Sequence, residues 1–181
     1  MLTQIICAGF GGQGILTTGI LISYGAFKNG NKITWYPSYG SEMRGGTANC
    51  TIKISDDNDI ASPYAKELDI LLAMNEPAID KFEERVKPGG WLFVNSSIVK
   101  DDRKYRDDIN VVKVDTVKLA KEAGNPKGEN IAMIGAILKK TGLLTYEQFE
   151  SSLIKYFTDK GKEKFNDANV AALKAGYESV E

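Results

Sequence analysis

Apolar residues along this chain gather into short runs that are separated by longer segments with helical periodicity. Six runs have the length and composition of β-strands: "TQIICA", "KITWYP", "TANCTIKI", "LDILLAM", "WLFVNSS" and "NVVKV". Helix-length segments lie between several of them, an alternation typical of an α/β fold. We therefore predict three α/β/α layers, with helices on both faces of a mixed, mostly parallel sheet.

The first helix is expected over residues 14–28, directly after an apolar strand and a glycine loop, and it ends at the "NG" of residues 29–30. A second helix begins near Glu76, and the "KPGG" of residues 87–90 is interpreted as its stop. The run 47–54 alternates apolar with polar residues, which predicts a strand that pairs antiparallel near an edge.

From about residue 130 the pattern turns helical, with "NIAMIGAILKKTG", "YEQFESSLIKYF" and "GKEKFNDANVAALKAGYESV". The length of 181 residues and the 43% hydrophobic content suit one compact core. We expect residues 1–181 to form a single α/β domain with a helical C-terminal segment at about 146–181.

Charge and composition argue against several classes of partner. The net charge is −1, so no basic surplus is available to neutralise a row of nucleic-acid phosphates. The start "MLTQIICAGFGG" lacks a basic region before its short apolar run, and no later stretch approaches a membrane span. We expect a cytoplasmic protein that binds neither nucleic acid nor membrane.

The two cysteines, Cys7 and Cys50, lie far apart in the sequence, each within an apolar run, which suits reduced core thiols better than a disulfide. The chain has no histidine. Iron–sulfur clusters usually take four thiolates and zinc nearly always takes cysteine or histidine, so we expect no metal bound by this chain.

The stretch "GFGGQG" places Gly9, Gly11 and Gly14 in the spacing of a dinucleotide-binding loop. Such a fold also needs a carboxylate about 20 residues further on to bind the ribose hydroxyls. No Asp or Glu occurs between residues 15 and 41, which counts against NAD(P). A tight strand-to-helix turn and an anion site at the helix N-terminus both remain as interpretations.

A second loop, "YPSYGSEMRGGTANC" at residues 36–50, combines turn formers with side chains that are enriched at binding surfaces. It follows the second strand, so we expect it at the carboxyl edge of the sheet, beside the first glycine loop. A solvated ion pair is the plainer interpretation of Glu42 and Arg44.

With both loops and the following "LLAMNEPAIDKFEERVKPGGWLFVNSS", the chain resembles the gamma subunit of 2-oxoacid:ferredoxin (acceptor) oxidoreductases over roughly its first 145 residues. The 2-oxoglutarate (KorC-like) type is the most similar, and pyruvate and branched-chain enzymes have similar gamma chains. The resemblance implies a Rossmann-like fold of the kind found in domain III of pyruvate-ferredoxin oxidoreductase.

The resemblance also implies a division of labour. Alpha and beta subunits would bind thiamine diphosphate with magnesium, and a beta or delta subunit would hold the iron–sulfur clusters. The overall reaction would transfer the acyl group to coenzyme A and reduce ferredoxin. The gamma chain would pack against these subunits and be inactive alone. An isolated chain is expected to self-associate through the surface meant for its partners.

Our hypothesis is that the first loop presents backbone N–H groups, with Arg44 and Tyr39 beside them, to partner subunits or to an anionic part of coenzyme A. Asn75 and Asn95 follow apolar runs, where asparagine can reach a site or cap a turn. No catalytic residue is assigned, and the candidate cofactor-binding or subunit-interface residues are Gly11, Gly12, Gln13, Gly14, Tyr39, Ser41, Glu42, Arg44, Gly45, Gly46, Asn75 and Asn95.

Two alternatives stay open. One is a subunit of an indolepyruvate or other aryl 2-oxoacid oxidoreductase, and the other is a stand-alone nucleotide-binding protein. The sequence does not name the 2-oxoacid, the stoichiometry of the complex or the direction of the reaction. It also leaves open whether this chain touches coenzyme A or thiamine diphosphate.

Overall fold

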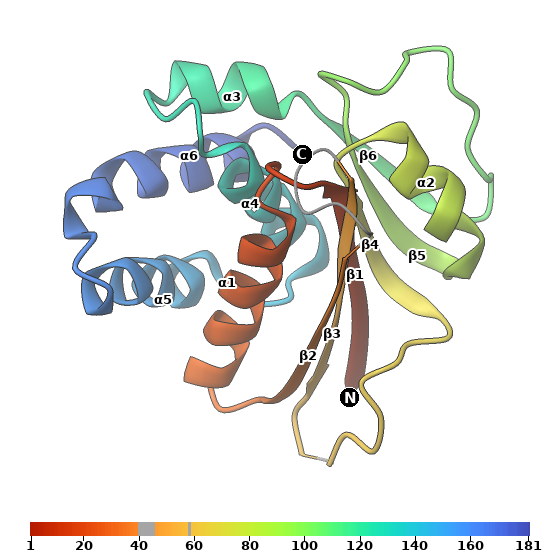
Figure 1. Ribbon diagram of the computed structural model, residues 1–181, viewed down its shortest axis with the longest axis horizontal. Coiled ribbons are helices and arrows are strands. Elements are labelled where there is room, and N and C mark those ends of the chain that lie inside the picture. The colour runs from red at the N-terminus through yellow and green to blue at the C-terminus, as the bar shows by residue number, and fades with distance from the viewer. Residues whose placement is uncertain (40–45, 58) are drawn as a thin grey trace.

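The computed structural model describes residues 1–39, 46–57 and 59–181, and its centre is a six-stranded sheet with the order β2-β3-β1-β4-β5-β6 (Figure 1). Its strands are β1 Leu2–Phe10, β2 Lys32–Tyr39, β3 Thr47–Ser55, β4 Leu68–Ala73, β5 Val86–Asn95 and β6 Asn110–Val114. The α-helices are α1 Ile15–Lys28, α2 Glu76–Phe82, α3 Thr116–Glu122, α4 Glu129–Thr141, α5 Tyr146–Asp159 and α6 Asn166–Glu178. Two short 3₁₀ helices span Glu83–Arg85 and Glu163–Phe165.

The predicted fold class is confirmed. β1 pairs parallel with β4, β4 with β5, and β5 with β6, whereas β3 runs antiparallel to both β1 and β2. The sheet is therefore mixed and mostly parallel. β3 is the antiparallel strand that the alternation of residues 47–54 predicted, and it lies second from the β2 edge.

Helices cover both faces of the sheet, but unequally (Figure 1). α2 packs on one face, over a core that includes Ile6, Leu71 and Val94. The other face carries α1 and α4, with α3, α5 and α6 around them, over a larger core that includes Ile5 and Phe93. Most apolar burial thus lies on the α1 face.

The segment 87–90 corrects one expectation. These residues lie inside β5 rather than in a stop after the helix, because α2 already ends at Phe82 and one 3₁₀ turn follows it. β5 begins irregularly, with a register shift opposite Leu68 and Ile70. Gly89 has a φ of 75° there, a backbone conformation that favours glycine.

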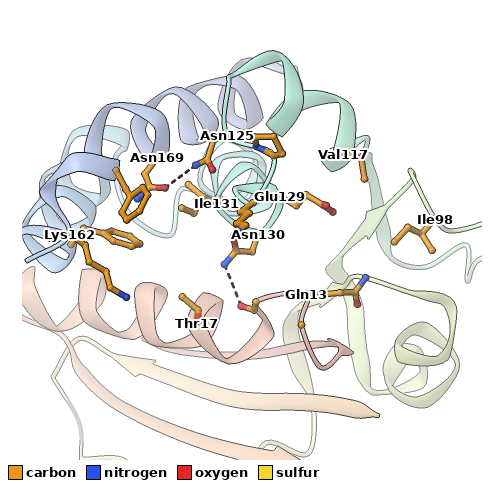
Figure 2. Close-up of a pocket in the computed structure, with 16 residues that line it drawn as sticks. Gln13, Thr17, Ile98, Val117, Asn125, Glu129, Asn130, Ile131, Lys162 and Asn169 are labelled. Carbon is orange, nitrogen blue, oxygen red and sulfur yellow. Dashed lines mark hydrogen bonds between the residues drawn. The ribbon is translucent and has the colours of Figure 1, made fainter. Parts of the chain in front are cut away.

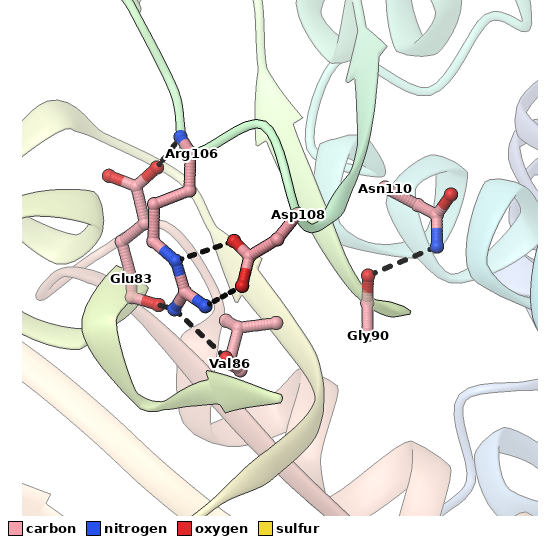
Figure 3. Close-up of polar contacts among 6 residues, drawn as sticks. All are labelled: Glu83, Val86, Gly90, Arg106, Asp108 and Asn110. Atoms are coloured by element: carbon pink, nitrogen blue, oxygen red, sulfur yellow. Dashed lines mark hydrogen bonds and ion pairs between the residues drawn. The ribbon is translucent and has the colours of Figure 1, made fainter. Parts of the chain in front are cut away.

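Arg106 stabilises the connection between β5 and β6 at the end that precedes β6 (Figure 3). The Arg106 guanidinium donates to both carboxylate oxygens of Asp108, at 2.9 and 2.6 Å, and to the backbone oxygens of Glu83 and Val86. Paired hydrogen bonds of this kind are among the stronger polar contacts in proteins. They raise the pKa of Arg106 and lower that of Asp108.

Candidate functional site

The first glycine loop joins β1 to α1 and has the geometry of a tight turn. Gly12 and Gly14 adopt positive φ values of 102° and 71°, which explains why glycine occupies both positions. The carbonyl oxygen of Gly14 accepts hydrogen bonds from the backbone N–H and the hydroxyl of Thr18, each at 2.8 Å. The loop therefore leads directly into the first turn of α1.

The side chain of Gln13 ties the end of β1 to the end of β4. Its Oε1 accepts from the backbone N–H of Phe10 at 2.7 Å and from Nδ2 of Asn75 at 3.4 Å, and its Nε2 donates to the carbonyl of Met74 at 3.2 Å. A Cβ at Gly9 would lie 2.6 Å from Gln13 Oε1, so a side chain there would displace this bridge. Gln13 thus has a structural task at the sheet edge.

Two of the four backbone N–H groups in the loop are used inside the protein. Gly11 N donates to the carbonyl of Gly46 at 2.8 Å, and Gln13 N donates to the carbonyl of Phe10 at 3.1 Å. Within the described ranges, no acceptor pairs with the N–H of Gly12 or Gly14. Among the residues that the structure describes, these two N–H groups are therefore the ones available to an anion, fewer than the hypothesis of a whole loop of donors assumed.

The second glycine-rich loop meets the first through that bond between Gly11 and Gly46. Tyr39, the last residue of β2, is 53% exposed, and β2 runs parallel to β1, so both strands end at the same edge. Four predicted site residues of this loop lie outside the described residues: Ser41, Glu42, Arg44 and Gly45. Whether the loop binds a ligand or partner stays a prediction.

Asn75 and Asn95 lie at strand ends as expected, and both are buried. Oδ1 of Asn75 accepts from the backbone N–H of Ala78 at 2.9 Å and so caps α2. Oδ1 of Asn95 accepts from the N–H of Ser97 at 3.1 Å, while its Nδ2 is buried without a partner among the described residues. Capping roles account for the oxygen contacts of both side chains.

The structure adds a cleft of about 630 Å³ that three of the predicted residues share (Figure 2). It lies between the glycine loop and the helical half of the chain. Its lining combines residues from the glycine loop and α1, from the start of α4, from the end of α5 and from around the start of α6. The lining residues are Gly12, Gln13, Gly14, Thr17, Ile98, Val117, Asn125, Pro126, Lys127, Glu129, Asn130, Ile131, Phe157, Lys162, Phe165 and Asn169.

Three asparagines line the wall opposite the glycine loop. Nδ2 of Asn130 donates to the carbonyl of Gly14 at 3.3 Å and joins α4 to the loop (Figure 2). Nδ2 of Asn125 donates to Oδ1 of Asn169 at 2.9 Å. Nδ2 of Asn169 is buried and has no partner in the described part of the chain, so this wall has an unused hydrogen-bond donor.

The rim of the cleft is apolar at several points. The side chains of Ile98, Val117 and Phe165 are 50%, 43% and 45% exposed. Lys127 and Lys162 add positive charge. Amide donors, apolar side chains and lysines together suit a ligand or partner segment that is partly apolar and partly anionic.

The asparagine wall was not among the predicted site residues. Asn125 and Asn130 belong to "AGNPKGEN", a stretch rich in Gly, Pro and Asn before a strongly apolar helix, and that composition was the available signal. Asn169 lies in the first turn of α6, next to alanines, and gave no such signal. The structure leaves Tyr39, Asn75 and Asn95 outside the lining of this cleft.

Comparisons with known proteins agree on one family. The family model described as pyruvate ferredoxin/flavodoxin oxidoreductase matches residues 4–179. The ketoisovalerate oxidoreductase subunit VorA of Methanothermobacter marburgensis is 36% identical over 175 residues, which cover 96% of this chain and 35% of VorA. The 2-oxoglutarate synthase subunit KorC of Methanocaldococcus jannaschii is 32% identical over 180 residues, covering 98% of this chain and 94% of KorC.

A solved structure has the same fold. The gamma subunit of the keto/oxoacid ferredoxin oxidoreductase from Geobacter sulfurreducens matches with a TM-score of 0.80 at 28% identity, covering 97% of this chain and 96% of that subunit. The chain thus spans about a third of the length of its VorA relatives and nearly all of KorC. Among the described residues, every helix is too short or too polar to span a bilayer.

The family model covers nearly the whole chain, and relatives above 30% identity match it from end to end. The resemblance to the gamma chains of oxoacid oxidoreductases is therefore confirmed. This chain belongs to the pyruvate ferredoxin/flavodoxin oxidoreductase family.

Proposed function

We propose that this chain serves as the gamma subunit of a multisubunit 2-oxoacid:ferredoxin oxidoreductase that acts on 2-oxoglutarate, pyruvate or a branched-chain 2-oxoacid. Residues 1–181 would act there as one domain, in the cytoplasm. The observation that carries this proposal is the match to separate KorC and gamma-subunit chains over nearly their whole length. The chain's own residues agree with a supporting role, because they include two cysteines and no histidine.

The proposed partners are alpha and beta subunits with thiamine diphosphate and Mg²⁺, and a beta or delta subunit with iron–sulfur clusters. Thiamine diphosphate supplies the carbanion chemistry of oxidative decarboxylation when it is bound. Coenzyme A would take the acyl group as co-substrate, and ferredoxin would receive electrons through the complex. The gamma chain contributes surface and shape rather than a reacting group.

Within this chain, the proposed contact region is the edge where the two glycine-rich loops meet, together with the cleft above it. The N–H groups of Gly12 and Gly14, which have no acceptor among the described residues, lie at the N-terminus of α1, where the helix dipole favours negative charge. Lys162 lines the same cleft. This combination supports contact with an anionic part of coenzyme A or an acidic segment of a partner subunit.

Gentle purification of the tagged chain from its native host tests the role as a whole. We expect subunits that bind thiamine diphosphate and iron–sulfur clusters to copurify, and we expect 2-oxoacid oxidation by the assembly but none by the isolated chain. Substrate trials on the assembly would separate 2-oxoglutarate, pyruvate and branched-chain acids from aryl acids such as indolepyruvate. A chain that emerges alone and binds one nucleotide saturably would instead be a stand-alone nucleotide-binding protein.

The cleft is tested by removing one of the two lysine charges in its lining. In the assembly, Lys162→Met should raise the apparent KM for coenzyme A or weaken subunit binding by about tenfold, as expected for the loss of one charged contact. Lys174→Met is the matched control, because Lys174 is a 63% exposed lysine of α6 that does not line the cleft. Arg44→Ala should act like Lys162→Met. If Lys162→Met behaved as the parent and the Lys174→Met control do, the cleft would have no part in binding; if Arg44→Ala did so, the proposed contact of the second loop would be wrong.

A further inference from the structure

The two cysteines of the chain lie directly opposite each other in the sheet. In the antiparallel ladder between β1 and β3, Cys7 is the register partner of Cys50. Both side chains belong to the core on the α1 face, and both are 0% exposed. The sequence places these residues 43 positions apart, so only the strand register brings them together.

This position meets the geometric requirements of a disulfide. Directly opposite residues of an antiparallel pair have Cα atoms about 4.5 or 5.5 Å apart, and disulfides accept Cα separations of about 4.4–6.8 Å. Their Cβ atoms are about 4.5–5.5 Å apart, against about 3.8 Å across a disulfide. Bond formation therefore asks for a movement of about 1 Å.

The two thiols also differ in acidity in the way that such a reaction needs. A hydrogen bond from the thiol of Cys7 lowers the pKa of Cys50, although burial opposes this shift. The same contact and burial raise the pKa of Cys7 well above its ordinary value. Cys50 is thus the more acidic of the two thiols, and in its protonated form it donates to the carbonyl of Ile15 at 3.7 Å. Thiolates are the reactive form.

The pair lies at the base of the candidate site. β1 leads from Cys7 into the first glycine loop, and β3 leads from the second glycine-rich loop to Cys50. The bond between Gly11 and Gly46 joins the same two strands at their loop ends. Cys50 also contacts α1, since a Cβ at Gly19 would overlap its sulfur. A covalent link here would fix the two segments that hold both loops.

We propose that Cys7 and Cys50 form a reversible cross-strand redox pair, oxidised by hydrogen peroxide to a disulfide that staples the base of the glycine-loop site. The Cys50 thiolate attacks one peroxide oxygen, which gives a Cys50 sulfenic acid and hydroxide. The Cys7 sulfur then attacks the Cys50 sulfur, the S–O bond breaks, and the hydroxyl leaves with the Cys7 proton as water. The hydroxide takes up the proton that Cys50 lost, so that in total two thiols are oxidised and one peroxide is reduced to two waters.

The experiment treats the full chain with hydrogen peroxide, removes the oxidant, unfolds the protein in iodoacetamide and measures its intact mass. Before treatment we expect two alkyl groups per chain, and afterwards none, with a loss of two hydrogens that dithiothreitol reverses. Peptide mapping should recover the linked peptides of Cys7 and Cys50. The oxidised chain should melt about 5 °C higher than the reduced one, because the link restricts the unfolded state.

The variants Cys7→Ala and Cys50→Ala distinguish the two roles. In Cys7→Ala, the Cys50 sulfenic acid lacks its resolving thiol and should be trapped by dimedone. In Cys50→Ala, the Cys7 thiol should react with peroxide more slowly than the Cys50 thiol does in Cys7→Ala. Cys7 should therefore still be alkylated after a longer peroxide treatment. If the parent chain still took up two alkyl groups, or went directly to sulfinic and sulfonic acids without a linked peptide, the proposal would be overturned. The parent chain alone decides this, so a variant that fails to fold does not weaken the test.

Discussion

At the scale of single residues, the candidate site depends on the backbone conformation and the close contact that glycine permits at position 14. Gly14 is the N-cap of α1, with φ 71° and ψ 20° in the left-handed region. A Cβ at this position would also lie 2.8 Å from Nδ2 of Asn130, the side chain that joins α4 to the loop. Backbone conformation and contact therefore both favour glycine here.

The substitution Gly14→Ala should destabilise the protein by about 2 kcal/mol. Roughly 1 kcal/mol comes from placing alanine in the left-handed region and about another 1 kcal/mol from the lost hydrogen bond of Asn130. Gly142→Ala is a matched control, because Gly142 has φ 62° and ψ 23° with open space around its Cβ position. It should cost only about 1 kcal/mol in urea unfolding.

In an Asn130→Ala background, the excess cost of Gly14→Ala over Gly142→Ala should disappear, because the side chain that the new methyl displaces is gone. The coupling is measured from the unfolding free energies of Gly14→Ala and Gly142→Ala, each with and without Asn130→Ala. An excess that persisted without Asn130 would mean that the loop is strained for another reason.

At the scale of elements, the helical half of the cleft is built on the crossing of α4 and α6. A Cβ at Gly176 would overlap the carbonyl oxygen of Ala132, and one at Gly135 would overlap that of Leu173. The two backbones therefore approach each other closely through a pair of glycines. This contact sets where Asn130, on α4, lies relative to Asn169, on α6.

We expect Gly176→Ala to destabilise the protein by about 2 kcal/mol and to alter the cleft. Alanine improves helix propensity by about 1 kcal/mol, but the helices must separate to admit the methyl group. Gly25→Ala is the control, since a Cβ there would meet side-chain atoms of Phe149 and Leu144 at 3.1–3.3 Å rather than backbone. It should change the unfolding free energy by less than about 1 kcal/mol. Equal effects of the two substitutions would argue against close backbone packing as the cause.

At the scale of the whole molecule, apolar surface is left uncovered along the β2 side of the sheet. Tyr36, Tyr39 and Tyr64 are 40%, 53% and 63% exposed, and the rings of Tyr36 and Tyr64 pack edge to face at 5.0 Å. β2 is also the last strand at its edge of the described sheet. Exposed edges and aromatic groups of this kind favour association.

An isolated chain should therefore self-associate at high concentration, with light scattering giving a mass above that of one chain. Adding positive charge to the patch with Tyr36→Lys and Tyr64→Lys should shift the distribution toward monomer. Phe165→Lys is the control, because Phe165 is 45% exposed but lies on the rim of the cleft instead. A strict monomer at all concentrations would contradict this expectation, and loss of association in the control alone would place the contact at the cleft.

Several features could be predicted because they depend on neighbouring residues in the sequence. The apolar runs predicted all six strands, and the glycine loop predicted the start of α1. The alternation of β3 predicted its antiparallel direction correctly, but the expected wetter face is absent, because the polar residues Thr51 and Lys53 are buried. The "KPGG" segment was misjudged because its glycines belong to an irregular strand start that β6 supports. There Asn110 donates to the carbonyl of Gly89 and, as Figure 3 shows, to that of Gly90.

The sequence by itself determined the fold class and the family, because periodicity and loop composition are local properties. Only the tertiary structure decided that Gly11 pairs with Gly46, that Cys7 faces Cys50 and that Asn130 reaches Gly14. These contacts join segments far apart in the chain. They depend on strand order, register and helix crossing, which no short stretch of sequence encodes alone.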